Sequence, residues 1–279
     1  TVKHIVGLLL NPAALIISPD ECTASFDVDA IRDMTFPVID QENPVLRFMD
    51  VVYYHIRSGA TSTEYAGYAY EVDVAYNDLW RDDLESPYFD KLLTGLVGPE
   101  NSAGRMAFRY LLAQMWFKAG GDSRAMVIKG YGKNGKSTLV KVLTAILPSG
   151  VTYNCEMSTL SGSNSTDTAG RMELLGKHLV IVGDVTDYDL DMKLKPLIAG
   201  DAGITAKFLF KNPVTFKNTA SFLFMVNSFP RVTKDISAFL RRFIIVESKV
   251  KIREVVRDLD EKIVRDERAA VWKYILTSV

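Results

Sequence analysis

The sequence contains few of the residues that build disulfide frameworks and metal centres. Its 279 residues include only two cysteines, Cys22 and Cys155, and three histidines, His4, His55 and His178. Zinc sites need several such ligands at short, regular spacings, and these residues show no such spacing. We therefore interpret the cysteines as small buried residues of a reducing compartment, and the histidines as packing or surface residues.

Long apolar segments are also absent. No apolar run approaches the roughly 18 residues of a membrane-spanning helix. The first residues, "TVKHIVGLLLNPAALIIS", lack the basic flank and the cleavage pattern of a signal peptide. The sequence therefore predicts a globular, cytoplasmic protein without a membrane partner. Because residue 1 is Thr and not Met, we expect a fragment of a longer polypeptide, although processing would give the same start.

The chain as a whole has no excess of either charge, but its parts do. The formal net charge is −1, yet residues 1–100 carry 17 acidic against 6 basic side chains, and residues 191–251 carry 11 basic against 4 acidic ones. A basic segment in a nearly neutral protein is compatible with a polyanion bound in a groove or channel. A solvated basic surface would explain the same charges.

The most informative motif is a glycine-rich loop between an apolar run and a helix-like run, in "MVIKGYGKNGKSTLVKVLTAIL". Gly130, Gly135, Lys136 and Ser137 satisfy the pattern G-x-x-x-x-G-K-[ST] in full. Glycines let backbone N–H groups surround an anion, and the N-terminus of the following helix adds its positive dipole end. A glycine-rich turn that binds no nucleotide is the alternative, but such a turn does not require the complete motif.

This loop predicts a site for ATP and Mg²⁺. Lys136 would reach the β- and γ-phosphates, and the hydroxyl of Ser137 would bind Mg²⁺. The residues expected to bind the nucleotide are Gly130, Gly132, Lys133, Asn134, Gly135, Lys136, Ser137 and Thr138.

Apolar periodicity predicts the elements around the loop. Residues 86–121 show helical spacing and end at glycines, which favours two helices, and the charged, amphipathic tail favours one closing helix or a pair. The runs that favour strands are "AMVI", "HLVIV", "ASFLFMV" and "RFIIV". Strands that alternate with helices predict an α/β fold, namely a P-loop ATPase core with a mainly parallel sheet.

These expectations divide the chain into four segments. Residues 1–84 are an acidic region to which we assign no fold, residues 85–123 are a helical segment, residues 124–250 are the ATPase core, and residues 251–279 are a C-terminal helical segment. No internal repeat or low-complexity tract indicates a further boundary.

Polar residues occur at the ends of three predicted strands. Asp184 ends "GKHLVIVGD", where a P-loop ATPase needs a carboxylate for Mg²⁺ and for the attacking water. Asn227 ends "SFLFMVN" and could orient a water against the γ-phosphate. Arg241 and Arg242 precede the last strand, where a guanidinium could reach across a subunit boundary. Taken singly, each could also be a turn former or a solvated side chain.

The order of these features resembles that of the superfamily 3 helicases, in the primase-helicase branch of phages, plasmids and large DNA viruses. The resemblance is carried by "NGKST", "LGKHLVIVGD", "LKPLIAGDAGITAKFLFKNPVTF" and "VNSFPRV", within about residues 86–250. The chain looks similar to the C-terminal helicase part of a phage primase-polymerase. The resemblance implies an AAA+-like core, a collar in residues 85–123, a hexameric ring, and the host cytoplasm as the location if a phage encodes the protein.

The resemblance also implies partners and residue roles. The partners would be single-stranded DNA in a central channel, replication forks, and a fused N-terminal primase or polymerase domain, with travel from 3′ to 5′. Lys136, Asp184 and Asn227 of one subunit would face Arg242 of the next. Arg242 is preferred to Arg241 because it directly precedes the strand.

The segment "ITAKFLFKNPVTF" would be the hairpin that grips DNA in the channel. Two β-rich runs are joined there by a Lys-Asn-Pro turn, with lysines for phosphates and aromatic rings for stacking. The predicted DNA-binding residues are Lys207, Phe208, Phe210 and Lys211. Because alternate strand residues face opposite ways, we expect at least one of the two rings in the core.

One position departs from the family pattern. The resembling proteins usually carry Glu at the end of the acidic strand and often two acids, whereas here Gly183 precedes Asp184. The shorter side chain predicts weaker activation of water, or assistance from Asp187 or Asp189, and puts turnover in question more than nucleotide binding.

This departure leaves alternatives to the helicase open. A replication initiator or translocase would hydrolyse ATP without sustained unwinding, and an assembly module would bind ATP only to stabilise a ring. A P-loop small-molecule kinase would need an arginine-rich lid and an acceptor pocket, neither of which the sequence shows, and it would leave the basic hairpin unexplained. A helicase or a closely related translocase is our prediction.

Overall fold

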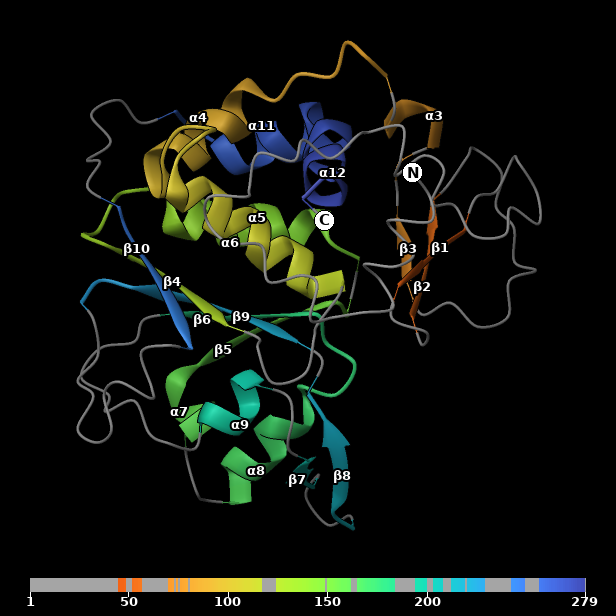
Figure 1. The fold of residues 1–279 in the computed structure, drawn as a ribbon, viewed down its shortest axis with the longest axis vertical. Coiled ribbons are helices and arrows are strands. Elements are labelled where there is room, and N and C mark those ends of the chain that lie inside the picture. Colours follow the sequence, from red (N-terminus) through yellow and green to blue (C-terminus); the bar gives the residue numbers. More distant parts are fainter. Residues whose placement is uncertain are drawn as a thin grey trace.

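The centre of the fold is a five-stranded sheet with helices on both faces (Figure 1). The structure is a computed structural model. It describes residues 45–48, 52–56, 70–72, 74, 76–79, 81–116, 124–148, 150–161, 165–183, 194–199, 203–207, 212–218, 220–228, 242–248 and 256–278.

All neighbouring strands of the central sheet are parallel, in the order β10-β4-β9-β6-β5. The strands are β4 (Ala125–Gly130), β5 (Thr152–Glu156), β6 (Leu179–Gly183), β9 (Ser221–Val226) and β10 (Phe243–Ser248). Every residue of β9 is buried, as expected for a central strand covered on both faces. The predicted α/β fold with a mainly parallel sheet is confirmed.

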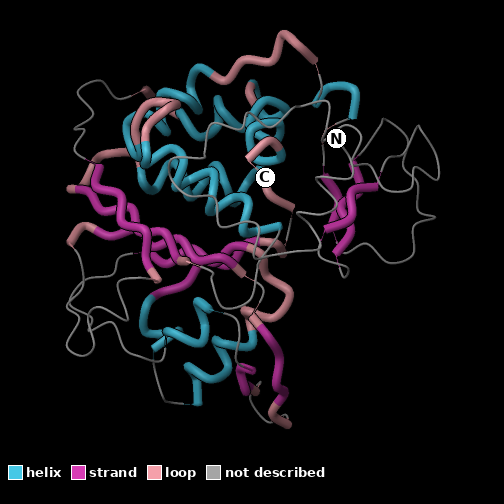
Figure 2. Tube along the Cα trace, viewed as in Figure 1, coloured by secondary structure: helices cyan, strands magenta, loops and turns pink. Residues whose placement is uncertain are grey.

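One face of the sheet is covered by the helices before the glycine-rich loop, the helix after it and the C-terminal helices (Figure 2). They are α4 (Pro87–Val97), α5 (Ala103–Trp116), α6 (Lys136–Ile146), α11 (Leu259–Asp266) and α12 (Arg268–Leu276). Phe108 of α5 and Trp272 of α12 are fully buried in the same apolar core as Leu223 of β9. The segment predicted as a collar therefore packs on the central sheet. The helices before residue 123 and after residue 251 share one apolar core with that sheet.

Polar contacts also tie α4 and α5 to the C-terminal helices. Both carboxylate oxygens of Glu267 accept hydrogen bonds at 2.8 Å, from the backbone N–H groups of Tyr88 and Phe89 in the first turn of α4. These N–H groups have no partner within their own helix. The guanidinium of Arg109 lies 4.3 Å from the ring centroid of Tyr274. The C-terminal helices thus fix the start of α4.

The other face carries three short helices and a hairpin. The helices are α7 (Met157–Ser161), α8 (Ser165–Met172) and α9 (Leu194–Ala199), and the hairpin joins β7 (Gly203–Ala206) to β8 (Val214–Lys217). They enclose a second apolar core with Phe222, Phe224 and Phe243 of the sheet. In Figure 1 the hairpin lies at the end of the molecule away from α11 and α12.

The N-terminal region contains a small sheet of its own. Strand β1 (Val45–Phe48) pairs antiparallel with β2 (Val52–Ile56), and β2 pairs parallel with β3 (Tyr70–Val72). Helix α3 (Tyr76–Leu79) follows. No residue pattern indicated a fold for this region, and the boundary at residue 84 stays a prediction. Among the described helices, none is long and apolar enough to cross a membrane.

Candidate active site

The glycine-rich loop connects β4 to α6, as the motif predicts. Strand β4 ends at Gly130, and α6 begins at Lys136. Gly135, which directly precedes the helix, has a φ of 96°, in the left-handed region where a side chain would be strained. Lys133 also has a positive φ, of 63°. The two positive φ values mark the bend that leads from the end of β4 into the first turn of α6.

Asn134 of the loop lies close to Gly130 at the end of β4. A Cβ atom on Gly130 would lie 2.1 Å from Nδ2 of Asn134 and 3.0 Å from Cβ of Ser248 in β10. Asn134 is buried, with only 4% of its surface exposed. A side chain at position 130 would therefore force the buried Asn134 side chain to move. At Gly132, by contrast, a Cβ atom would meet open space.

The ammonium group of Lys136 is held by oxygen atoms of the loop itself. Its Nζ donates hydrogen bonds to the carbonyl oxygen of Gly130 and, at 3.0 Å, to Oδ1 of Asn134. Nδ2 of the same asparagine is buried and has no hydrogen-bond partner in the part of the chain that the structure describes. Leaving such a donor unpaired costs about 1–3 kcal/mol. The loop thus collects an ammonium group, an unpaired donor and a helix N-terminus around one small region.

This set of donors fits a phosphate group and its metal ion. Cationic and N–H donors match phosphate oxygens, and the exposed hydroxyl of Ser137 at the start of α6 is a hard oxygen ligand of the kind that Mg²⁺ prefers. Thr138 is half-buried in the same turn. The predicted nucleotide-binding residues are therefore brought together by the fold.

Parallel pairing brings the ends of several strands to the same edge as the loop. Lys129 of β4 pairs with Val226 of β9, so Gly130 and the exposed Asn227 occupy adjacent positions. Strand β6, which ends at Gly183, is the next strand beyond β9. The carboxyl ends of parallel strands are where α/β proteins bind ligands. Asp184, Asp187 and Asp189 lie outside the described residues.

Arg242 lies beside the amino-terminal ends of the strands, opposite the carboxyl ends where the loop lies. Its carbonyl oxygen accepts a hydrogen bond at 2.8 Å from the backbone N–H of Ala125, the first residue of β4. Gly130 is five residues further along the strand, which corresponds to about 16 Å at roughly 3.3 Å per residue. Arg242 is therefore too far to reach the phosphate loop of its own chain. Arg241 lies outside the described residues.

The predicted hairpin is present, and its two faces differ. Ile204 and Ala206 of β7 are buried, whereas Thr205 faces Thr215 across the hairpin with 2.8 Å between their hydroxyl oxygens. Lys207, the residue after β7, is exposed. The alternation anchors one face in the core and presents the other to solvent. The remaining predicted DNA-binding residues, Phe208, Phe210 and Lys211, lie outside the described residues.

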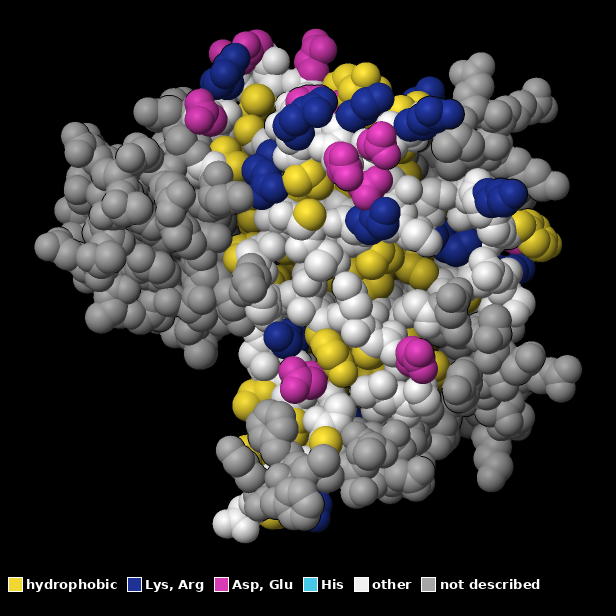
Figure 3. Space-filling model, turned by 180° about the vertical axis from the view of Figure 1, so that it is seen from behind, with side chains coloured by type: hydrophobic (Ala, Val, Ile, Leu, Met, Phe, Trp, Pro, Cys, Tyr) yellow, Lys and Arg dark blue, Asp and Glu magenta, His cyan; other side chains and the backbone are white. Residues whose placement is uncertain are grey.

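The described surface shows no large region of one charge in the view from behind. Figure 3 shows lysine and arginine side chains interspersed with acidic ones over the helical layer. Most of the basic residues that the sequence gathers in 191–251 are not among those described. The expected polyanion-binding surface thus stays a prediction.

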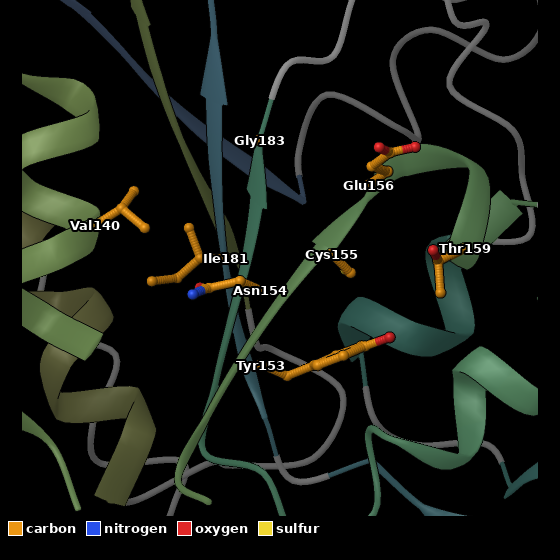
Figure 4. A pocket seen from close by; sticks show the side chains of 8 residues that line it. All are labelled: Val140, Tyr153, Asn154, Cys155, Glu156, Thr159, Ile181 and Gly183. Carbon is orange, nitrogen blue, oxygen red and sulfur yellow. The ribbon is translucent and has the colours of Figure 1, made fainter. Parts of the chain in front are cut away.

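Sequence reasoning missed strand β5 at the edge of the sheet and, with it, Glu156. The strand reads "TYNCE" and has no continuous apolar run, because its outer edge is exposed. A cavity of about 470 Å³ lies beside it, lined by Glu156, by Gly183 and Ile181 of β6, and by Val140 of α6 (Figure 4). Burial raises the pKa of the Cys155 thiol in the same strand to about 12, so this thiol is neutral at physiological pH.

Solved structures share this architecture. The apo structure of the NrS-1 C-terminal region is 19% identical to the chain, with a TM-score of 0.56, and the match covers 78% of this chain and 52% of that one. A second apo structure of the region, in its A form, gives 19% identity, a TM-score of 0.54 and the same coverage. The chain has the fold of the NrS-1 C-terminal region. At 19% identity this likeness shows the α/β fold alone.

The other comparisons set the limits of this likeness. The chain spans about half the length of the NrS-1 region that it matches. The JCV helicase is 12% identical to the chain, and the match covers 67% of this chain and 53% of that one. Its TM-score of 0.43 is too low to establish a shared fold. A family of unknown function (DUF5906) matches residues 128–242, from β4 to the start of β10. No curated protein matches the sequence.

Proposed function

We propose that the chain is an ATP-driven DNA helicase or translocase of the superfamily 3 type, active as a hexameric ring in DNA replication. The observation that carries this proposal is the environment of Lys136: a complete phosphate loop at the carboxyl edge of a parallel sheet, with its ammonium group held by loop oxygens that a phosphate would replace. The fold shared with the NrS-1 C-terminal region supports the same function.

The residues of the loop bind and orient ATP. Lys136 contacts the β- and γ-phosphates, and the N–H groups at the start of α6 surround the phosphate oxygens. Ser137 and Asp184 hold Mg²⁺, which neutralises phosphate charge when bound. Asp184 accepts the proton of the attacking water, and Asn227, one strand away from Gly130, orients that water.

Arg242 completes the site of a neighbouring subunit. Its position at the amino edge of the sheet, about 16 Å of strand from Gly130, excludes action on the nucleotide of its own chain. A guanidinium from the next subunit would stabilise the charge that develops on the transferred phosphoryl group. Hydrolysis would then depend on closure of the interface, which couples ATP turnover to subunit motion.

The hairpin of β7 and β8 is the element that contacts single-stranded DNA at the replication fork. Its inner face is anchored by Ile204 and Ala206, while Lys207 and the Thr205–Thr215 pair face outward. A rigid base with a polar outer face suits an element that changes height with the state of the ATP site. A primase or polymerase domain fused to this chain belongs to the same proposal.

A second function is favoured by one observation. Gly183 stands where the resembling helicases usually carry an acid, and no described residue packs so closely against it that a glycine is demanded there. A chain with weak water activation could serve as an initiator or assembly module that binds ATP and DNA without sustained unwinding.

ATP hydrolysis in the presence and absence of single-stranded DNA tests the proposal. We expect turnover that DNA stimulates, and its loss in Lys136→Ala. Lys141→Ala is the matched control, because Lys141 lies on the same helix with an exposed side chain and an ion pair to Asp260. ATP binding without hydrolysis would favour the assembly module, and absence of ATP binding would contradict both functions.

A further inference from the structure

The tip of the phosphate loop is exposed, and one of its residues has an unusual backbone conformation. Tyr131, Gly132 and Lys133 are exposed to solvent. The φ of Lys133 is 63°, in the left-handed region that residues with a side chain rarely adopt. Among the described residues other than glycine, only Asp258 shares a positive φ. A lysine is strained in this conformation, and strain of this kind is concentrated at functional sites.

The left-handed residues shape the loop for an anion. Gly135, two residues after Lys133, has a φ of 96°. Turns that contain left-handed residues point successive backbone N–H groups into one concavity, and such concavities bind anions. Glycine at position 133 would supply the same N–H group without strain. The loop motif allows any residue at this position. Neither the motif nor the backbone therefore accounts for a lysine there.

The ammonium group of Lys133 is free to bind a ligand. It makes no hydrogen bond or ion pair in the part of the chain that the structure describes. The neighbouring lysines differ, because Lys129 of β4 pairs with Glu247 at 2.9 Å and Lys136 is held by oxygens of the loop. Only two residues separate Lys133 from Lys136. Both side chains are long and flexible, so the two ammonium groups reach the same anion in the concavity of the loop.

We propose that the ammonium group of Lys133 contacts the phosphate chain of the bound nucleotide, as a second cation beside Lys136. This inference rests on the proposed function. The attraction grows with the charge of the phosphate chain, so Lys133 favours a nucleoside triphosphate over a monophosphate, whatever the base. Because the Lys133 side chain is exposed, salt screens its attraction more strongly than it screens the half-buried Lys136.

Nucleotide titrations of wild-type protein, Lys133→Gly and Lys133→Arg test the proposal. At low salt we expect Kd for ATP to rise about 5–20-fold in Lys133→Gly, and Kd for AMP to change less than about twofold. In about 1 M salt, where the screening length is about 3 Å, the effect on ATP should shrink below about threefold. Lys133→Arg should bind ATP nearly as wild type does. Lys177→Gln removes the same charge before the amino end of β6, and this control should leave Kd unchanged.

Thermal unfolding without nucleotide separates a ligand contact from a structural role. Glycine adopts a φ of 63° freely, and this relief offsets the added freedom of the unfolded chain, so Lys133→Gly should unfold at about the temperature of wild type. If wild-type protein binds ATP and Lys133→Gly binds it equally well, the role of Lys133 is overturned while the proposed function stands. A loss of affinity that is equal for ATP and AMP, or that persists in high salt, would also overturn it. If wild-type protein binds no ATP, the proposed function fails and the role of Lys133 fails with it.

Discussion

Replacing Asn134 by Asp perturbs the ammonium group of the phosphate loop without changing its shape. In the structure Oδ1 of Asn134 accepts a hydrogen bond at 3.0 Å from Nζ of Lys136, and only 4% of the surface of Asn134 is exposed. A carboxylate there would hold the ammonium as an ion pair. Hydrogen bonds with a charged partner are worth about 1.5–3 kcal/mol, and bonds between two charged groups are stronger still.

The expected consequence is a loss of ATP affinity. If the carboxylate holds Lys136 by an additional 1.5–3 kcal/mol or so, and 1.4 kcal/mol corresponds to a tenfold change, Kd for ATP rises about 10–100-fold. Repulsion between the carboxylate and the phosphates acts in the same direction. The free protein should not lose stability, because the unpaired Nδ2 is replaced by an oxygen that Lys136 can also contact.

Two measurements on the same samples check this reasoning. Titration with a fluorescent ATP analogue gives Kd, and thermal unfolding without nucleotide gives stability. Asn101→Asp, at an exposed turn before α5, is the matched control and should leave both unchanged. If the Asn134→Asp protein binds ATP as tightly as wild type, the hydrogen bond between Asn134 and Lys136 does not limit ATP binding and the reasoning is refuted. A protein that unfolds earlier with unchanged affinity would do the same.

Four further predictions follow from single contacts. His178 is buried, and burial lowers its pKa, so the unfolded chain binds a proton at His178 below pH about 6.5 while the folded chain does not. The free energy of unfolding should therefore fall with pH in this range, by up to about 1.4 kcal/mol per pH unit. Urea unfolding of His178→Asn should lack this slope, and an unchanged slope would contradict the assignment. Glu267→Ala leaves two N–H groups at the start of α4 without their acceptor and should lower the free energy of unfolding by about 2 kcal/mol or more, while an equal loss in Glu261→Ala would argue against this contact. Arg242→Ala should reduce kcat for ATP about 10³-fold or more with nucleotide binding intact, and normal turnover would remove it from the site. Lys207→Ala should weaken binding of single-stranded DNA and lower the salt slope of log K by about 0.7; an identical slope would exclude a phosphate contact.

The sequence predicted the features that depend on local residue order. The phosphate loop could be recognised because its glycines, Lys136 and Ser137 must follow one another between a strand and a helix. The central strands β4, β6 and β9 were visible as apolar runs, because a strand buried on both faces needs apolar residues at every position. The hairpin was visible because its two β-rich runs flank a turn.

Features that depend on contacts between distant residues could not be predicted. Strand β5 is exposed along one edge, so its residues carry no apolar signal, and its pairing with β6 decides that Glu156 meets Gly183. The parallel pairing of β10 with β4 places Arg242, which precedes β10, at the end of the sheet away from its own phosphate loop. The shared layer of α4, α5, α11 and α12 likewise arises from packing between segments more than 140 residues apart. Periodicity identified these helices but not their neighbours.

Strand separation on a forked duplex with a 3′ tail tests the central claim most directly, namely that ATP turnover at the phosphate loop moves DNA. Wild-type protein and Lys141→Ala should separate the strands only when ATP is present, and Lys136→Ala should leave the fork closed. A fork that opens equally well in Lys136→Ala, or that stays closed while wild-type protein hydrolyses ATP in the same tube, would contradict the claim.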